Sequence, residues 1–317
     1  MHRTGILKTI VVAIEVIEIA GLLIVLFGGA LLWPADLITF FWPYLLLPAA
    51  AILVLALFVP GWQAKVAAMA GVLLVAVPMM QLPEAPALST HRSLRLIAAN
   101  LYIENPDPSG FLAVLSETRP DVVVTEETRA NVAEAIRATK EFPYESSSDL
   151  RAANDIKVFS RFPIASEQLV GASAAERHAI RLELKLPGGP LVVYAVHPAT
   201  PRSPPEWRAR NRYLSALATS IDSTPAGIPV VAAGDWNTPP WSDYFAGFFG
   251  QTGLRYARSD WGPLPTRFSL RMGGITSFGS PIDHVAVSSN VKLVHWQRGP
   301  KFGSNHLPVL VDLEISG

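Results

Sequence analysis

The feature that most constrains this chain is a series of three long apolar segments within its first 82 residues. They cover about residues 10–33, 38–59 and 64–82. Each approaches the roughly 20 residues that a helix needs to cross the roughly 30 Å hydrocarbon core of a bilayer. The charged side chains in this region are few: Arg3, Lys8, Glu15, Glu18, Asp36 and Lys65. We therefore predict three transmembrane helices, and an integral membrane protein anchored in the lipid bilayer.

Two other interpretations of these segments are weaker. A buried core helix in a water-soluble fold would account for one such segment but not for three in series. A cleaved signal peptide would fit the basic start at Arg3 and Lys8, but the first segment is longer than a typical signal core and two more follow it. Residues 34–36 and 60–62 contain turn residues, and we predict them to be connectors.

The basic residues predict the orientation of the helices. Arg3 and Lys8 precede the first segment, and Lys65 lies between the second and third. Because basic residues favour the cytoplasmic side, the N-terminus is predicted to be cytoplasmic. Three crossings then place residues from 83 onward on the extracytoplasmic side.

Glu15 and Glu18 are unusual inside an apolar segment. Three residues apart, they lie on one face of a helix. A carboxylate at the centre of a bilayer costs about 2.5–3.5 kcal/mol on insertion scales. We expect Glu15 to lie near the interface and Glu18 to be protonated or packed between helices. The alternative is a pair that senses or moves a species in the membrane.

Residues 83–93 are rich in Pro, Ser and Thr and are predicted to be a linker, followed by one domain over 94–317. The whole chain has 26 basic and 26 acidic residues, so composition shows no strongly basic face for nucleic acid. It has no cysteine, which excludes disulfides, thiolate metal sites and a cysteine nucleophile.

The pattern after residue 94 alternates short β-rich runs with helical stretches, which predicts a layered α/β domain. Predicted strands cover residues 94–99, 121–125, 156–160, 179–186, 191–196, 229–233, 282–288, 291–296 and 308–313. Predicted helices cover residues 108–118, 130–140 and 206–220.

Polar residues of four types, Asn, Asp, Glu and His, cluster at the ends of these strands. They are Asn100, Glu126, Glu127, His197, Asp235, Asn237, Asp283, His284, Asn305 and His306. Any one of them alone is an ordinary turn or hydrogen-bonding residue. Since strand ends at one edge of a sheet are where sites are built, the recurrence predicts a site.

The chemistry of this set suits phosphoryl transfer. Oxygens of Glu127, Asp235 and Asn100 are hard ligands, which favour Mg²⁺ or Mn²⁺. His306 can take a proton from an attacking water, and Asp283 can orient its imidazole.

His197 and Asn237 complete the predicted set, because both can donate hydrogen bonds to phosphoryl oxygens. No covalent nucleophile is needed.

Five segments carry a family resemblance: Leu-Ile-Ala-Ala-Asn ending at Asn100, Pro-Asp-Val-Val-Val-Thr-Glu-Glu-Thr ending at Thr128, Gly-Asp-Trp-Asn ending at Asn237, Ile-Asp-His ending at His284, and Ser-Asn-His-Leu-Pro-Val ending at Val309. Their order and spacing resemble the endonuclease/exonuclease/phosphatase superfamily, which includes deoxyribonuclease I, apurinic endonucleases, inositol polyphosphate phosphatases and neutral sphingomyelinases. The resemblance covers about residues 94–315 and is greatest to bacterial membrane-attached members.

The resemblance implies a four-layer sandwich of two packed β-sheets flanked by helices. It also implies a metal-dependent phosphoesterase in the bacterial inner membrane, with the catalytic domain on the periplasmic side. Site roles are carried over by position: the metal ligands are Glu127, Asn100 and Asn305; the catalytic residues are His306, Asp283, Asp235, Asn237 and His197; the substrate-binding residues are Arg161 and Arg208.

One departure from the family pattern concerns Asn305, which stands where members usually have Asp. Loss of this negative charge predicts weaker metal affinity or altered pH dependence. It also motivates an alternative, a catalytically weak or inactive membrane-tethered module that binds a phosphorylated ligand.

The substrate class stays open at this stage. A lipid-linked or inositol-type head group fits membrane attachment, and a nucleic acid would fit an Arg-rich helix over residues 207–212. The alternative is that this segment is an ordinary amphipathic helix whose basic face is exposed to solvent.

Overall fold

The computed structural model describes residues 2–147, 149, 155–174, 176–258 and 264–315. The chain forms two compact units. One contains the residues up to Leu82 together with Pro239–Ala246, and the other contains Pro83–Thr238 and the residues from Gly247 onward. We call them the helical unit and the sheet unit.

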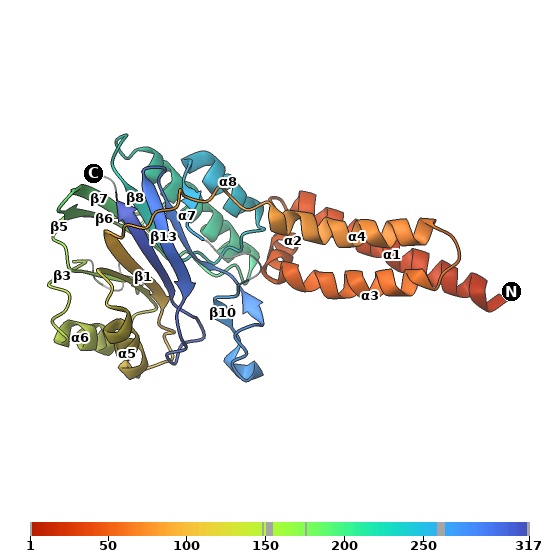
Figure 1. Cartoon of the computed structure of the whole chain (residues 1–317), viewed down its shortest axis with the longest axis horizontal. Helices are drawn as coiled ribbons and strands as arrows, with labels where there is room; N and C mark the ends of the chain where they lie inside the picture. Colours follow the sequence, from red (N-terminus) through yellow and green to blue (C-terminus); the bar gives the residue numbers. More distant parts are fainter. Residues whose placement is uncertain (1, 148, 150–154, 175, 259–263, 316–317) are drawn as a thin grey trace. The chain divides into compact units, whose positions relative to one another are not determined.

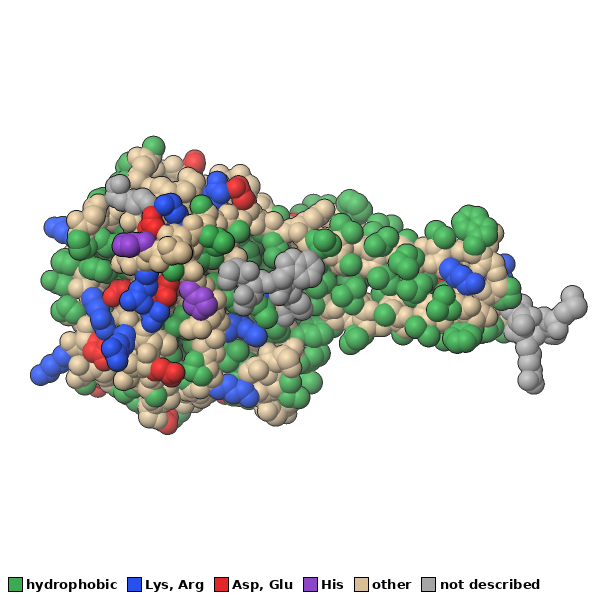
Figure 2. Space-filling view, in the orientation of Figure 1, with side chains coloured by type: hydrophobic (Ala, Val, Ile, Leu, Met, Phe, Trp, Pro, Cys, Tyr) green, Lys and Arg blue, Asp and Glu red, His purple; other side chains and the backbone are tan. Residues whose placement is uncertain are grey.

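The helical unit contains three helical segments long and apolar enough to cross a membrane: Ile6–Gly28, Trp33–Leu57 and Gln63–Met80. Its elements are α1 (His2–Gly28), α2 (Trp33–Ile38), the 3₁₀ helix η1 (Thr39–Leu45), α3 (Leu46–Leu57) and α4 (Gln63–Met80). Large apolar side chains cover the face of these helices seen in Figure 2. Phe27 and Leu31, for example, are each 78% exposed, which suits a hydrocarbon environment.

One predicted connector is helical instead. Residues 34–36 form the first turn of α2, and α2, η1 and α3 follow one another without a break. Proline is favoured in the first turn of a helix, where its missing N–H costs no hydrogen bond, so Pro34 fits the first turn of α2. Asp36 in the same turn is fully buried and accepts a hydrogen bond from Ser242 Oγ at 2.5 Å.

Two mixed six-stranded sheets and their flanking helices build the sheet unit (Figure 1), which confirms the predicted fold. The first sheet has the order β13-β14-β1-β2-β4-β3 and the second β5-β6-β7-β8-β12-β9. The pairs β1–β2 and β7–β8 are parallel, and the other pairs are antiparallel.

The element bounds are as follows. The strands are β1 (Leu94–Asn100), β2 (Val122–Glu126), β3 (Tyr144–Glu145), β4 (Lys157–Ser160), β5 (Ile164–Val170), β6 (Ala179–Leu186), β7 (Gly189–Val196), β8 (Val230–Asp235), β9 (Arg255–Tyr256), β10 (Arg267–Phe268), β11 (Gly279–Ser280), β12 (Asp283–Val287), β13 (Val291–Arg298) and β14 (Val309–Ile315). The helices are α5 (Ser109–Thr118), α6 (Ala130–Ala138), α7 (Pro204–Asp222), α8 (Asp243–Thr252) and the 3₁₀ helix η2 (Leu270–Met272).

The core lies between the two sheets. Alternate residues of both sheets form one buried cluster, which includes Leu96, Val124, Val193 and Val285. On the outer face of the first sheet, α5 and α6 add a second cluster around Phe111 and other residues. This packing explains the continuous apolar runs in β2 and β8, because strands covered on both faces need no polar side.

Residues 83–93, predicted to be a linker, run along the sheet unit. Ser89 N donates to Leu293 O at 2.9 Å, and Leu293 N donates to Ala87 O at 2.8 Å. Leu293 belongs to β13, the edge strand of the first sheet. An edge strand has unpaired backbone groups, and this segment satisfies part of them.

Candidate active site

Strand register brings the predicted site residues together. Asn100 ends β1 and pairs with Glu126 at the end of parallel β2. Asp235 ends β8 and pairs directly with Asp283, the first residue of antiparallel β12. His306 lies just before β14, whose first residue, Val309, pairs with Ala98 near the end of β1. The site therefore lies at the ends of strands from both sheets.

Asp235 is the centre of the cluster. Its Oδ2 accepts a hydrogen bond from Asn100 Nδ2 at 3.1 Å and lies 3.9 Å from Nε2 of both His197 and His306. Its Oδ1 accepts from the backbone N–H of Asn237 at 2.9 Å. All of these side chains are buried.

The predicted pair of His306 and Asp283 is formed. Nδ1 of His306 lies 3.0 and 2.9 Å from the two carboxylate oxygens of Asp283. Both side chains are at most 4% exposed, so this hydrogen bond is little weakened by water. With Nδ1–H donating to Asp283, the Nε2 atom of His306 carries the lone pair and lies on the side of Asp235.

Burial and mutual repulsion set the acidity of these groups. Burial raises the pKa of Asp235 to about 7, and the nearby Asp283 carboxylate contributes to the rise. Burial by itself lowers the pKa of His306, but the charge and hydrogen bond of Asp283 outweigh it and the net shift is upward. Several acidic groups buried close together favour a cation among them.

Glu126 and Glu127 differ in their surroundings, although they are neighbours. Glu127 has a positive φ of 50°, and its Oε1 and Oε2 accept from Asn100 Nδ2 at 3.2 Å and from Ile103 N at 2.8 Å. Glu126 is fully buried, and burial beside Asp283 and Asp235 raises its pKa well above the ordinary range. Glu127 is therefore the carboxylate that joins the site's polar network.

The sequence offered no carboxylate partner for His197, and the structure provides Asp235. It also adds Arg177, whose guanidinium lies 3.1 Å from Nδ1 of His197. Arg177 lies just before β6 and belongs to none of the sequence motifs. Only the pairing of β6 with β7, which carries His197 at its end, brings it to the site.

Arg210 is a further residue that the sequence pattern misplaced. It is fully buried, and its guanidinium donates to the backbone oxygen of Asn237 at 3.3 Å. The predicted solvated basic face of α7 is thus interrupted. Arg212 is paired with Glu176, and Arg208 is exposed. Among the described residues, Arg208 makes no hydrogen bond or ion pair with the cluster.

Arg161 is not brought to the site. It follows β4, which runs antiparallel to β2, and its backbone N–H bonds to Asp121 O at the start of β2. Glu126 and Glu127 lie at the other end of that strand. The Arg161 guanidinium is instead 3.2 Å from Glu141. A role for it in substrate binding therefore finds no geometric support.

The donor set fits a hard divalent cation. Asp235, Asp283 and His306 each offer a ligand atom, and these atoms lie within 4.8 Å of one another. Glu127 joins them through Asn100. The Oδ1 atom of Asn305 is buried and has no hydrogen-bond partner in the described part of the chain, so it is free to act as a ligand. Oxygens predominate, as Mg²⁺ requires.

Comparisons with known proteins address the family and the fold of the chain. A sequence profile of the Endonuclease/Exonuclease/phosphatase family matches residues 97–306. No curated protein matches the chain. Among solved structures, an endonuclease/exonuclease/phosphatase from Beutenbergia cavernae has a TM-score of 0.54 at 21% identity, covering 72% of each chain.

Two further solved structures share the fold. Sphingomyelinase C from Streptomyces griseocarneus has a TM-score of 0.54 at 16% identity and covers 70% of this chain and 99% of its own. A mutant beta toxin from Staphylococcus aureus with bound magnesium ions has a TM-score of 0.53 at 14% identity and covers 69% and 99%. The profile match over most of the sheet unit, together with this fold, shows that the chain belongs to the endonuclease/exonuclease/phosphatase family.

Proposed function

We propose that this protein hydrolyses phosphate esters at a membrane surface with the help of Mg²⁺ or Mn²⁺. The observation that carries the proposal is the buried pair of His306 and Asp283. The Nε2 atom of His306 in this pair lies 3.9 Å from Oδ2 of Asp235. The family relationship supports a phosphoesterase, and the magnesium-bound beta toxin of the same fold supports the cation.

Each residue of the cluster has a role in this proposal. His306 takes the proton of the attacking water at Nε2, while Asp283 holds Nδ1–H and stabilises the resulting imidazolium. His197, fixed between Asp235 and Arg177, donates to a phosphoryl oxygen. Asn237 is held by two hydrogen bonds: its backbone oxygen accepts from Arg210, and its side-chain Nδ2 donates to Pro198 O at 3.1 Å. Its backbone N–H in turn keeps Asp235 in place.

Glu127, Asn100 and Asn305 would hold the cation, with Asp235 beside them. A bound divalent cation would supply charge stabilisation to the phosphoryl group. Arg208, exposed on α7, is retained as a candidate contact for substrate outside the cluster.

The location is part of the proposal. The three apolar helices support an integral membrane protein. The basic residues Arg3, Lys8 and Lys65 support an inner-membrane orientation with the sheet unit on the periplasmic side.

The test is turnover of bis-p-nitrophenyl phosphate by the full chain in detergent, with and without Mg²⁺ or Mn²⁺. We expect metal-dependent release of p-nitrophenol that His306→Ala abolishes. The exposed His295 on β13 gives a matched control, because His295→Ala removes a histidine whose ring lies near Gln297 Oε1, at 3.4 Å, and which is not part of the cluster. Equal activity of His306→Ala and the control would contradict the proposal.

The alternative is a binding module without turnover, and Asn305 is the observation that favours it. Its uncharged Oδ1 has no hydrogen-bond partner among the described residues, and an aspartate there would add a charge. Asn305→Asp separates the two functions. An enzyme should keep turnover and need less Mg²⁺ for half-maximal rate, whereas a binding module should gain turnover from none.

A further inference from the structure

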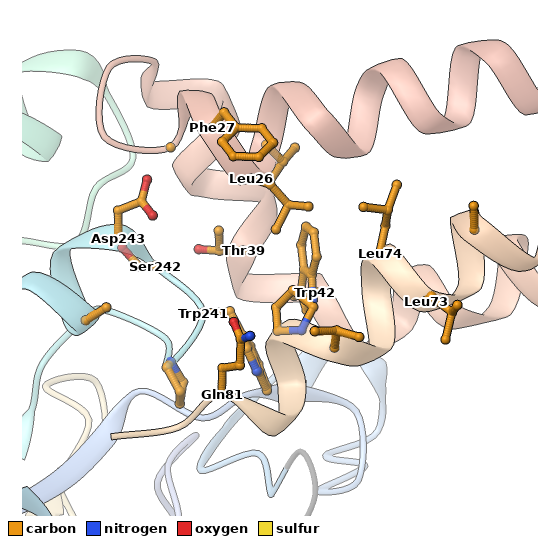
Figure 3. A pocket seen from close by; sticks show the side chains of 17 residues that line it. Leu26, Phe27, Thr39, Trp42, Leu73, Leu74, Gln81, Trp241, Ser242 and Asp243 are labelled. Carbon is orange, nitrogen blue, oxygen red and sulfur yellow. The ribbon is translucent and has the colours of Figure 1, made fainter. Parts of the chain in front are cut away.

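A pocket lies within the helical unit, and none of its lining residues belongs to the candidate active site. Its volume is about 650 Å³, in the range of sites that hold small molecules. Its walls come from α1, η1 and α4, and from the segment Pro239–Ala246, which belongs to the same unit. Figure 3 shows it from close by. Because one compact unit supplies every lining residue, the shape of the pocket does not depend on the position of the sheet unit.

The wall that α4 contributes is apolar because of its sequence. It consists mainly of Ala70, Leu73, Leu74 and Val77, which are three or four residues apart and so lie on one face of the helix. At a rise of 1.5 Å per residue, this face extends for about 10 Å. Leu73 and Val77 are also exposed, so the pocket borders the outer surface of the helices. The bilayer proposed to surround α1 and α4 supplies hydrocarbon chains that fit such a wall.

Polar groups lie at the other end of the pocket. In Figure 3, Ser242 and Asp243 are on the opposite side of the pocket from Leu73 and Leu74. The hydroxyl of Ser242 donates to Asp36, whereas the carboxylate of Asp243 is exposed. The pocket therefore has one apolar and one polar end, which is the arrangement that an amphipathic ligand requires.

One hydrogen-bond donor of the pocket is unused. The indole N–H of Trp241 is buried and has no partner among the described residues. The indole N–H of Trp42, by contrast, donates to Val75 O at 3.0 Å. A buried donor without an acceptor is costly, so a ligand of this pocket is expected to carry an acceptor at this point. The ester carbonyl at the head of an acyl chain is such an acceptor.

The charge of the pocket selects the head group of the ligand. The described residues that line it include Asp243 but no Lys, Arg or His. Burial raises the pKa of Asp243, and the nearby Asp36 carboxylate adds to the rise, although a hydrogen bond from the Ala30 backbone opposes it. Two neighbouring carboxylates favour a positive group beside them and disfavour a negative one. A head that carries an ammonium group fits this end, and a head with a net negative charge does not.

We propose that this pocket holds a zwitterionic glycerolipid with an ammonium head as a resident ligand of the helical unit. One acyl chain lies along the apolar face of α4, its ester carbonyl accepts from the Trp241 N–H, and the ammonium group pairs with Asp243. The lipid is held and not hydrolysed, so this inference is independent of the phosphoesterase function. Its effect is to stabilise the packing of α1, η1 and α4, because a ligand that binds only the folded state stabilises that state.

The first experiment measures head-group selectivity by native mass spectrometry. The full chain, freed of lipid in detergent, is offered phosphatidylethanolamine and phosphatidylglycerol with identical ester-linked chains, so that only the heads differ. We expect one ethanolamine lipid per chain, retained at least about fivefold more than the glycerol lipid. Equal retention of the two lipids by the wild-type protein would overturn the proposal.

A variant assigns this selectivity to one carboxylate. Asp243→Asn should bring the retention of the two lipids close to equality, because it removes the charge that attracts the ammonium group. Asp222→Asn, at the end of α7 and outside the lining, is the matched control and should keep the preference. An unchanged preference in Asp243→Asn would contradict the proposed pairing.

The second experiment locates the acyl chain. The full chain in detergent is photolabelled with a phosphatidylethanolamine that carries a diazirine in mid-chain, and the labelled residues are mapped by mass spectrometry. We expect labels on the pocket residues of α1 and α4, and labels spread evenly over the helices would overturn the proposal. Ala70→Phe fills the pocket and should remove the labels. Val66→Phe, one turn earlier on α4, exposed and outside the lining, should keep them.

The third experiment tests the unused donor. An ether-linked phosphatidylethanolamine has the same head and chains but lacks the ester carbonyl, so the wild-type protein should retain it about tenfold less than the ester-linked lipid. Trp241→Phe keeps an aromatic ring, removes the indole N–H and should abolish this difference. Trp62→Phe, exposed and outside the lining, is the control that should preserve it. Equal retention of the ester and ether lipids by the wild-type protein would refute the contact with Trp241 and the proposed orientation of the lipid.

Discussion

At the scale of single residues, the site depends on one oxygen. Oδ2 of Asp235 accepts a hydrogen bond from Asn100 and lies near the imidazoles of both His197 and His306. Burial, together with the nearby charge of Asp283, raises the pKa of Asp235 to about 7. The ionisation of each member of the cluster therefore depends on its neighbours.

Asp283→Asn should change the pH profile as well as the rate. The charge and hydrogen bond of Asp283 raise the pKa of His306. Without that charge the pKa of His306 falls, so the base stays neutral to lower pH. We expect kcat/KM on a phosphodiester to drop by roughly 10²–10⁴-fold and its acid limb to move to lower pH. Steady-state rates between pH 5 and 9 measure this, and an unmoved acid limb would exclude His306 as the titrating base.

His284 has a structural role in the same strand. It is fully buried between Thr238 O and the Tyr256 hydroxyl, each 2.9 Å from a ring nitrogen, and burial lowers its pKa to about 4. Between pH 6.5 and 4 the unfolded chain binds a proton here that the folded chain does not. The free energy of unfolding therefore falls as pH falls through this window, by at most on the order of 3 kcal/mol from this group.

His284→Gln removes this titration and keeps a side-chain donor and acceptor. Carboxyls with raised pKa values, such as Asp235, contribute with the opposite sign in both proteins, so the comparison between them isolates His284. We expect the melting temperature to fall less in the variant than in the wild-type protein between pH 7 and pH 4.5, by near-UV circular dichroism. Equal decreases would mean that His284 is protonated in the folded state.

At the scale of elements, the close pairing of β7 and β8 positions the site. Gly234 pairs with Val196 and has a φ of 142°. A Cβ at this position would lie 2.2 Å from Val196 O and 2.6 Å from Glu126 Oε1. The approach of the two backbones, which places Asp235 beside the end of β7, therefore requires glycine.

Gly234→Ala should destabilise the sheet unit by more than about 2 kcal/mol, because it adds both backbone strain and overpacking. Gly250→Ala on α8 is the control, since its added methyl meets no atom within 4 Å and it has no positive φ. The control should be neutral or gain about 0.5–1 kcal/mol from helix propensity. Thermal unfolding in detergent measures both, and equal melting temperatures would refute the role of Gly234.

The strand β5 and the helix α8 are among the elements that the sequence pattern did not predict. The edge strand β5 (Ile164–Val170) has an irregular burial pattern with polar Ser166, Glu167 and Gln168, so it lacks the apolar signal of a core strand. The helix α8 contains Gly247 and Gly250, which weaken the helical signal. Its Phe248 and Phe249 pack on Trp236, next to Asp235, so tertiary contacts stabilise it.

At the scale of the whole molecule, the proposed orientation can be tested with thiols, because the chain has no cysteine. Thr90→Cys introduces an exposed thiol after the third helix, and Gln63→Cys introduces one between the second and third. In intact bacterial cells with a permeable outer membrane, we expect a membrane-impermeant maleimide to label the first and not the second. The reverse pattern would place the sheet unit in the cytoplasm.

The sequence by itself determined a layered α/β domain, because apolar runs such as β2 and β8 indicate strands covered on both faces. The resemblance of its motifs to a known family implied the two packed sheets. The sequence also determined which polar residues meet, since Asn100, Glu127, Asp235, Asp283 and His306 all stand at strand ends. The three apolar helices followed from length and charge alone.

Only the tertiary structure decided the contacts that have no local signal. Arg177 and Arg210 reach the cluster through strand pairing and through the burial of one face of α7. The position of Arg161 also depends on tertiary structure. The sequence assigned it to substrate binding, but the antiparallel pairing of β4 with β2 places it at the opposite end of β2 from the site. Residues 239–246 join the helical unit for a similar reason. Such contacts depend on how segments distant in the sequence pack together. No single segment of the sequence is sufficient to predict them.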